Sequence, residues 1–404
     1  MKWFWGNFFG LVIVVTGVAQ WLCIAWLLIV AGGVAVPWWA HFVAPAIFSR
    51  VNRLLVRAPV TAGGISRSVR RAYTAVVFAS LFGMLALAAT GALWGTAHFG
   101  LEIANAAGLA VDPGRAGAAA KPFGTLALVM TLGAIGHGYT GGQRRVNVEK
   151  LRVSVRGRMK PLSVIQISDL HLGQYMDGEA IAAHVRRINA LEPDLICITG
   201  DITDGLEHAP ETFAALGGLK ASLGVLCILG NHDFYTGADD VEAALARYTD
   251  FTLLRDARTV IDTGSGPLHV IGLDDRGETW ARGLAQDRVL DELYGPIPAH
   301  EPVLLLTHRP DLFEHAAKLS VDITLAGHTH GGQLALPWPG RRPLTLARFM
   351  TRFPRGTYRS GTSTLHVNLG LGVTGQPVRV ASPREITLLT LVGKGEHECV
   401  SPAC

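Results

Sequence analysis

The first 148 residues carry almost no negative charge. Glu102 and Asp112 are the only acidic side chains before Glu149, although Arg and Lys recur there in clusters. Only 17% of the whole chain is charged and 49% is hydrophobic, which argues against a soluble protein throughout and indicates a partly membrane-embedded one. The basic residues flank apolar runs and form no nucleic-acid-binding motif, so no nucleic-acid partner is expected.

Cysteine is also scarce. Five cysteines in 404 residues, with no CxxC pair, exclude a dense disulfide framework and a thiol-based structural zinc site. Cys23 lies in an apolar run, and Cys197 and Cys227 lie in strand-like segments where buried free thiols are ordinary. Cys399 and Cys404 lie in a short polar tail and would pair only in an oxidising compartment. The cysteines therefore leave the location of the protein open.

Long apolar runs fill the N-terminal part of the chain. Residues 4–48 contain no charged side chain and exceed the apolar core of a signal peptide, which is about 7–15 residues long. This stretch has room for two helices of roughly 20 residues, with a break near residues 32–37. Two further runs cover residues 73–97 and 122–139. We therefore predict an all-helical transmembrane anchor of about four spans within residues 1–148.

Arginine-rich segments set the expected orientation. They cover residues 50–71 and 144–158, and the positive-inside rule places both on the cytoplasmic side. The predicted location is thus the cell (inner) membrane, as a multi-pass protein with a cytoplasmic C-terminal domain. If residues 4–48 span the bilayer once rather than twice, the N-terminus moves outside and the C-terminal domain stays inside.

From about residue 149 the pattern changes to short β-branched runs that alternate with helical periodicity. Such alternation is typical of an α/β domain in which strands pack between helical layers. We expect a catalytic domain over residues 149–395 and a C-terminal tail over residues 396–404. Strands are predicted at residues 163–167, 195–198, 226–229, 269–273, 303–306 and 323–326, and helices at residues 179–191 and 241–248.

Five polar clusters follow directly after these predicted strands. Ligand sites in open α/β sheets form beyond the carboxyl ends of strands, so the clusters are expected to meet at one rim. Imidazole and carboxylate groups suit Mn, Fe or Zn, and an Asp can bridge two ions. Two such ions would activate water and stabilise a phosphoryl transition state. The clusters occupy residues 168–171, 200–205, 230–233, 307–310 and 327–332.

In this order the clusters read Asp-x-His, Gly-Asp-x-x-Asp, Gly-Asn-His-Asp, His and Gly-His-x-His. Over residues 153–391 the chain thus resembles the calcineurin-like metallophosphoesterases, which implies a two-sheet β-sandwich flanked by helices and two divalent metal ions. The resemblance implies that His232 is the catalytic acid, oriented by Asp233, and that Asp201 bridges the ions. It assigns Asp169, His171 and His330 to one metal, and Asn231, His308 and His328 to the other.

A narrower resemblance is to the membrane-anchored bacterial branch of the family. It rests on Ser-Asp-Leu-His-Leu-Gly at residues 168–173, Gly-His-Thr-His-Gly-Gly-Gln at residues 327–333, and a Gly-x-Gly…Pro-x-Arg…Pro-x-Glu-Ile-Thr run within residues 370–387. Arg384 departs from this pattern, because a proline is usual there, and little consequence is expected.

The expected reaction is attack of a metal-bridging hydroxide on a phosphodiester or pyrophosphate bond. The membrane anchor suggests a lipid-linked or nucleotide-sugar substrate, by analogy with relatives that cleave UDP-2,3-diacylglucosamine. Candidate substrate-binding residues are Asp204, which equally suits a capping or supporting role, Arg309 and Arg379; Arg355 and Arg359 are weaker candidates.

Three alternatives remain at this stage. One is a phosphomonoesterase or protein phosphatase. The others are a non-catalytic membrane scaffold and a small transporter. A degenerate scaffold should have lost metal ligands, and the motifs are complete here. A transporter would carry intramembrane charges or interrupted helices in matched halves, and neither pattern is clear in residues 1–148. The physiological substrate, the native metals and the oligomeric state are left open by the sequence.

Overall fold

The computed structural model describes residues 2–57, 67–112, 114–157, 159–173, 175–277 and 284–394. The chain divides into two compact units, Met1–Tyr139 and Thr140–Cys404. The unit boundary precedes the expected one at residue 148, because residues 140–148 fold with the second unit. The predicted tail at residues 396–404, with its two cysteines, lies outside the described residues.

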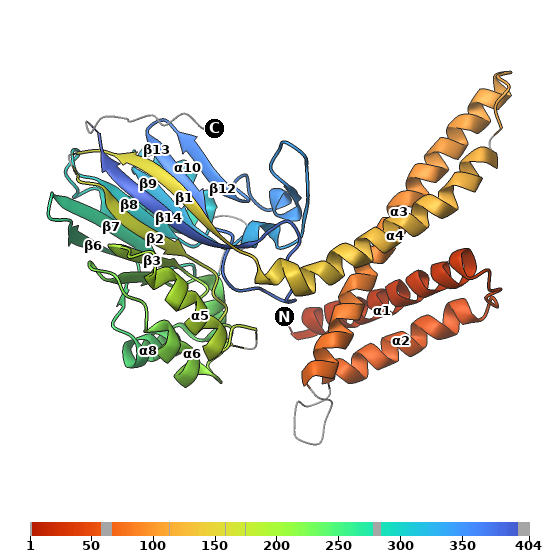
Figure 1. Cartoon of the computed structure of the whole chain (residues 1–404), viewed down its shortest axis with the longest axis horizontal. Helices are drawn as coiled ribbons and strands as arrows, with labels where there is room; N and C mark the ends of the chain where they lie inside the picture. Colours follow the sequence, from red (N-terminus) through yellow and green to blue (C-terminus); the bar gives the residue numbers. More distant parts are fainter. Residues whose placement is uncertain are drawn as a thin grey trace. The chain divides into compact units, whose positions relative to one another are not determined.

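The first unit is entirely helical in its described part (Figure 1). Residues 4–48 do supply two helices, separated near Gly33, whose φ of 60° is left-handed. The side chain of Asn52 joins three helices through buried hydrogen bonds, since it donates to Thr16 and Gln20 at 3.0 Å each and accepts from Tyr73 at 2.7 Å. The helices are α1 (Lys2–Trp26) with its π-helical extension η1 (Leu27–Ala31), α2 (Ala40–Arg57), α3 (Arg67–Ala106) and α4 (Gly114–His137), which continues as η2 (Gly138–Gly142).

Three helical segments among the described residues are long and apolar enough to cross a membrane: Gly10–Val30, Ala72–Ala106 and Ala118–Gly142. The sequence predicted about four spans. The difference lies in α2, which contains Pro45 and runs beyond the apolar stretch into a segment with Arg50 and Arg53. Charged guanidinium groups make that helix too polar for a spanning segment.

The described residues of the second unit form two six-stranded sheets and one small two-stranded sheet. The first large sheet has the order β1 (Val146–Val155), β14 (Arg384–Gly393), β2 (Leu162–Ile167), β3 (Leu195–Thr199), β4 (Val225–Ile228) and β5 (Thr252–Leu253). The second has the order β12 (Gly356–Ser360), β13 (Ser363–Val367), β9 (Ile323–Ala326), β8 (Val303–Thr307), β7 (Pro267–Leu273) and β6 (Ala257–Asp262). The small sheet pairs β10 (Ala335–Leu336) with β11 (Leu344–Thr345).

Alternating side chains explain why the two sheets stack. Along β3, Leu195 and Cys197 belong to the core between the sheets, whereas Ile196 and Ile198 pack under helices. Strand β8 alternates in the same way, with Leu304 in the inter-sheet core. Both faces of each sheet are therefore apolar and buried at these central strands. The predicted two-sheet sandwich flanked by helices is confirmed.

Helices cover the outer faces of the sandwich (Figure 1). Three cover the first sheet: α5 (Gly178–Asn189), α6 (Ala209–Leu216) and α8 (Ala238–Tyr248). Two cover the second: α9 (Leu284–Tyr294) and α10 (Phe313–Lys318), which follows η3 (Pro310–Leu312). Short helices lie near the strand ends: α7 (Asn231–Thr236), η4 (His330–Gly332) and η5 (Leu346–Phe349).

Candidate active site

The predicted polar clusters meet where parallel strands of both sheets end. Strands β2, β3 and β4 are parallel in the first sheet, and β7, β8 and β9 are parallel in the second. Their connecting loops are held in left-handed backbone conformations, which cost non-glycine residues of order 1–3 kcal/mol each and cluster at functional sites. The positive φ angles are 51° at Asp169, 46° at His171, 50° at Asp201, 69° at His328 and 50° at His330.

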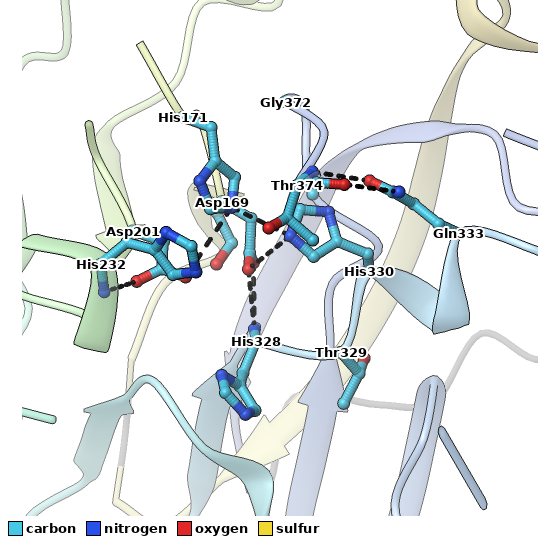
Figure 2. Close-up of polar contacts among 12 residues, drawn as sticks. Asp169, His171, Asp201, His232, His328, Thr329, His330, Gln333, Gly372 and Thr374 are labelled. Atoms are coloured by element: carbon cyan, nitrogen blue, oxygen red, sulfur yellow. Dashed lines mark hydrogen bonds and ion pairs between the residues drawn. The ribbon is translucent and has the colours of Figure 1, made fainter. Parts of the chain in front are cut away.

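Asp169, His171 and His330 form the first group of metal-type ligand atoms, all buried (Figure 2). The Nε2 atom of His330 lies 3.3 Å from Asp169 Oδ1 and 3.0 Å from His171 Nε2. Two imidazole nitrogens at this separation need a cation or a shared proton between them. The group therefore has the composition and spacing of a cation site.

Asp201, His308 and His328 form the second group. His308 Nε2 lies 3.1 Å from Asp201 Oδ2 and 3.2 Å from His328 Nδ1. The same Asp201 oxygen lies 3.7 Å from His171 Nε2 in the first group. The Asp201 carboxylate is thus placed between the two groups, where one side chain can serve both.

Hydrogen bonds on the outer ring nitrogens orient two of these imidazoles. His308 Nδ1 donates to the Thr199 carbonyl at 2.8 Å, so a neutral His308 leaves its Nε2 lone pair available to a cation in the second group. His171 Nδ1 lies 2.7 Å from Asp204 Oδ1, which directs its Nε2 toward the first group in the same way. A carbonyl or carboxylate behind the ring is the usual support of a metal-binding histidine.

Asn231 supplies an independent indication of a bound cation. Its side-chain oxygen is buried and meets no hydrogen-bond donor among the described residues. Buried polar atoms without a partner are rare in folded proteins, and an amide oxygen is a good ligand for a divalent cation. Asn231 lines the same cleft as Asp201 and His328. The residues present thus fit divalent metals bound through nitrogen and oxygen atoms.

The buried carboxylates of the site change the pKa values of the neighbouring imidazoles. Burial disfavours a charged imidazole, but the field of Asp201 and its hydrogen bond outweigh this and raise the pKa of His308 to about 10. Burial is likewise outweighed at His171, whose pKa is raised to about 9 by Asp204 and Asp201. Burial and the neighbouring His308 lower the pKa of His328 to about 3. Without metal, the site therefore retains protons on two of its imidazoles.

We expect metal affinity to rise with pH. Metal binding must displace the protons held by His171 and His308, whose pKa values are about 9 and about 10. Affinity should therefore increase by up to about tenfold per pH unit for each displaced proton, between about pH 7 and about pH 9. Calorimetric titration of the metal-stripped chain with Mn²⁺ in buffers of different ionisation enthalpy measures the affinity and the released protons. A flat affinity with no proton release would contradict this description of the site.

His232 lies beside the first group, and Asp204 orients it. His232 Nδ1 is 2.9 Å from Asp204 Oδ1, and burial of Asp204 is outweighed by its bonds to His171 and His232, which lower its pKa to about 2. The family resemblance gave the orienting role to Asp233, but the carboxylate beside the His232 ring is that of Asp204. Asp233 instead accepts backbone N–H bonds from Ile202, Thr203 and Gly230. It holds the β3 and β4 loops together.

The other two predicted substrate-binding residues, Arg309 and Arg379, lie in different surroundings. Arg309 lines the cleft, which has a volume of about 720 Å³, and its Nε donates to Asp275 Oδ2 at 2.6 Å. Arg379 is 1% exposed, and the carbonyl acceptors of its guanidinium group include Gly370 at 3.0 Å and Gly372 at 2.7 Å. The structure thus places Arg379 among backbone carbonyls and not in the lining of the cleft. Arg379 secures the loop behind His330.

Arg384, for which little consequence was expected, forms hydrogen bonds that connect two segments of the catalytic unit. Its buried side chain donates to the carbonyls of Gln143 and Leu371, and to the Gln143 side chain at 3.1 Å. It thus ties the chain just before β1 to the loop behind Asp169. A proline at this position would have no such bonds.

Two further residues that support the site, Gln333 and Asp275, were not predicted from the sequence. The Gln333 side chain accepts from the Thr374 backbone N–H at 2.7 Å and donates to its carbonyl at 2.9 Å (Figure 2). This pairing mimics a strand contact and fixes the loop that follows His330. The only signal in the sequence was the position of Gln333 at the end of a motif. Asp275, which holds Arg309, gave no signal.

Several known proteins are similar to this chain. The family model of the calcineurin-like phosphoesterases matches residues 162–332. The uncharacterized metallophosphoesterase YkuE of Bacillus subtilis is 31% identical over 280 residues, which are 67% of this chain and 94% of YkuE. A transmembrane protein with metallophosphoesterase domain from Danio rerio is 31% identical over 61% of this chain and 56% of its own length.

Among solved structures, a protein from Thermus thermophilus matches at 13% identity and a TM-score of 0.35, over 52% of this chain and 91% of the other. Since almost the whole of YkuE aligns, and since buried imidazole and carboxylate groups assemble where the family's motifs predict, the chain belongs to the calcineurin-like phosphoesterases and is a metal-dependent hydrolase of phosphoester bonds.

Proposed function

We propose that the protein is a membrane-anchored phosphodiesterase or pyrophosphatase with a two-metal centre. The observation that carries the proposal is the position of the Asp201 carboxylate, 3.1 Å from His308 Nε2 and 3.7 Å from His171 Nε2. Two bound divalent ions would lower the pKa of water and neutralise charge on the phosphoryl group. Asp169, His171, Asp201 and His330 would hold one ion; Asp201, Asn231, His308 and His328 would hold the other.

His232 is the proposed acid for the leaving oxygen. Its side chain is about one-third exposed, at 32%, and it lines the cleft with Asn231 and Asp201. The Asp204 carboxylate accepts from Nδ1, so Nε2 is the ring nitrogen that carries the transferable proton. A protonated imidazole held in this way can donate as the P–O bond breaks.

Arg309 is the proposed contact for the substrate phosphate. Its guanidinium group is positioned by Asp275 on the cleft wall, and Arg is well suited to bidentate phosphate binding. Lys318 adds a second positive charge to the same wall. These two cations are the candidate contacts for an anionic ester, on a wall that also carries Asp287, Asp311 and Glu314.

Replacing the two arginines with Met separates their roles. We expect Arg309→Met to raise KM by roughly tenfold, because one charge-assisted hydrogen bond is lost. Arg379→Met should leave KM near wild type but lower the free energy of unfolding by about 3 kcal/mol, since buried carbonyls lose their donor. Steady-state kinetics and thermal unfolding of the metal-loaded chain measure both. A raised KM in the Arg379 variant with unchanged stability would instead indicate that Arg379 binds the substrate.

The proposed location is the inner membrane, with several spans and a cytoplasmic catalytic unit. Three candidate membrane helices and relatives named as transmembrane proteins support membrane association. The arginine-rich segments at residues 50–71 and 144–158 favour the cytoplasmic side for the catalytic unit. With three spans the N-terminus would lie outside. A lipid-linked or nucleotide-sugar ester is the substrate class that suits such an anchor.

The test uses the full chain in detergent, loaded with Mn²⁺, with bis-p-nitrophenyl phosphate and p-nitrophenyl phosphate as substrates. We expect a higher kcat/KM for the diester, loss of activity with EDTA, and recovery when Mn²⁺ is restored. Preference for the monoester would favour a phosphomonoesterase instead. A folded chain with two bound metals that hydrolyses neither ester, nor a pyrophosphate diester, would favour the non-catalytic scaffold.

A further inference from the structure

A strongly basic pocket lies outside the metal site. It has a volume of about 400 Å³, and two aromatic side chains, Trp338 and Tyr358, share its lining with five arginines. No part of the proposed hydrolysis uses it. The arginines are Arg341, Arg342, Arg348, Arg352 and Arg355.

Little negative charge balances this pocket. Among the described residues, only Arg352 of the five forms an ion pair, with Glu314 at 2.8 Å. Arg342 is held in place by donating to the Thr357 carbonyl at 2.8 Å, and its guanidinium group lies 4.8 Å from the centre of the Tyr358 ring. The pocket therefore carries a net positive charge on side chains of which at least one is fixed in place, and we expect it to bind an anion.

Large apolar side chains project beside the same arginines. Phe349 is 90% exposed, Leu346 67% and Met350 64%, and Leu336 and Trp338 are exposed as well. Arg348, Phe349 and Met350 are consecutive, so charge and apolar surface alternate within one turn around η5. Leu346 and Met350 also line the catalytic cleft. An exposed apolar group of this size, bordered by cations, marks an interaction surface.

We propose that this surface, the basic pocket together with Leu336, Leu346, Phe349 and Met350, binds the face of an anionic phospholipid leaflet. The arginines would contact lipid phosphates, and the apolar side chains would enter the acyl boundary. A water-soluble phosphate would use the arginines but would leave Phe349 exposed to water. The candidate membrane helices of the chain keep it at a bilayer, which supplies the leaflet.

The consequence concerns access to the metal site. Because Leu346 and Met350 belong both to this surface and to the cleft wall, a phosphoester on a lipid could reach the cleft along an apolar path. The docking proposal itself does not depend on which ester is hydrolysed. It can therefore fail while the proposed hydrolysis stands, and the reverse also holds.

The test is hydrogen–deuterium exchange of the full chain in nanodiscs of phosphatidylcholine alone or mixed with phosphatidylglycerol. We expect amides of residues 344–352 to exchange several-fold more slowly in the phosphatidylglycerol discs. The double variant Arg341→Gln/Arg348→Gln should lose this difference, since each arginine near an anionic surface contributes about fivefold to binding. Phe349→Ser should weaken it. Arg288→Gln, which removes an exposed arginine side chain of α9, should preserve it.

Hydrolysis of bis-p-nitrophenyl phosphate should stay near wild type in the arginine variants, which shows that the fold and the metal site persist. Equal exchange of residues 344–352 in the two kinds of disc would overturn the proposal. Equal slowing by soluble glycerol phosphate in phosphatidylcholine discs would also overturn it, because the pocket would then bind free phosphate rather than a leaflet.

Discussion

Asp201→Asn should reduce kcat/KM by at least about 10³-fold. Electrostatic stabilisation of a developing charge is worth about 10²–10³ in rate for each preorganised group, and Asp201 lies between both ligand groups. The amide retains the shape of the side chain but loses the charge that would balance two cations. The measurement is the rate of diester hydrolysis with Mn²⁺ in excess, compared with the wild-type chain.

A matched control is available in the same cleft. Asp287→Asn makes the same chemical change on the cleft wall, where the carboxylate lies 3.8 Å from His315 and away from both ligand groups. This variant should stay within a few-fold of wild type. If the Asp201 variant kept more than about one-tenth of wild-type activity, an electrostatic role serving two ions would be contradicted.

His232→Ala should lower kcat by about 10²–10⁴-fold for esters with a poor leaving group, the range attributed to general acid–base catalysis. The loss should be much smaller for a p-nitrophenyl ester, because p-nitrophenolate departs without needing a proton. The readout is thus the ratio of losses for an alkyl and a p-nitrophenyl diester. A merely structural His232 would lower both rates equally.

The control for this variant is His300→Ala, which removes an imidazole with 83% exposure that is absent from the cleft. Both of its rates should equal wild type. Asp204→Asn should resemble the His232 variant in part, since the carboxylate that holds Nδ1 is lost. An unchanged leaving-group dependence in His232→Ala would contradict the acid role.

The sequence pattern predicted the buried strands and the convergence of the polar clusters for a simple reason, whereas the two-sheet sandwich was implied only by the family resemblance. Strands buried on both faces read as short, nearly continuous apolar runs, as in β3 and β8. In parallel strands the residues that follow each run must lie at the same edge of the sheet. This rule places Asp169 and Asp201 at one edge of the first sheet and His308 at an edge of the second, since each follows such a run. It does not predict that the two edges meet.

The supporting contacts could not be predicted in the same way. Asp204 and Asp233 both follow a motif glycine, and only the loop geometry decides that Asp204 faces His232 while Asp233 faces backbone amides. Arg379 was expected at the substrate, as cations near a phosphate site often are. Its burial behind the loop at residues 369–372 depends on tertiary packing that no local pattern records.

The helical unit shows a second limit of the sequence. An uncharged stretch predicts helices but not where each one ends, and α2 begins within the apolar run and finishes among arginines. Counting apolar residues therefore overestimated the spans by one relative to the three candidates. A helix that is half apolar and half basic suits a membrane surface better than its interior.

The most direct test of the central claim is the metal content of the full chain after stripping, loading with Mn²⁺ and gel filtration, combined with electron paramagnetic resonance. Two ions held through the Asp201 carboxylate would lie roughly 3.5–4 Å apart. We predict two Mn²⁺ per chain with an exchange-coupled spectrum that is lost in Asp201→Asn. One Mn²⁺ per chain, or two magnetically independent ions, would contradict it.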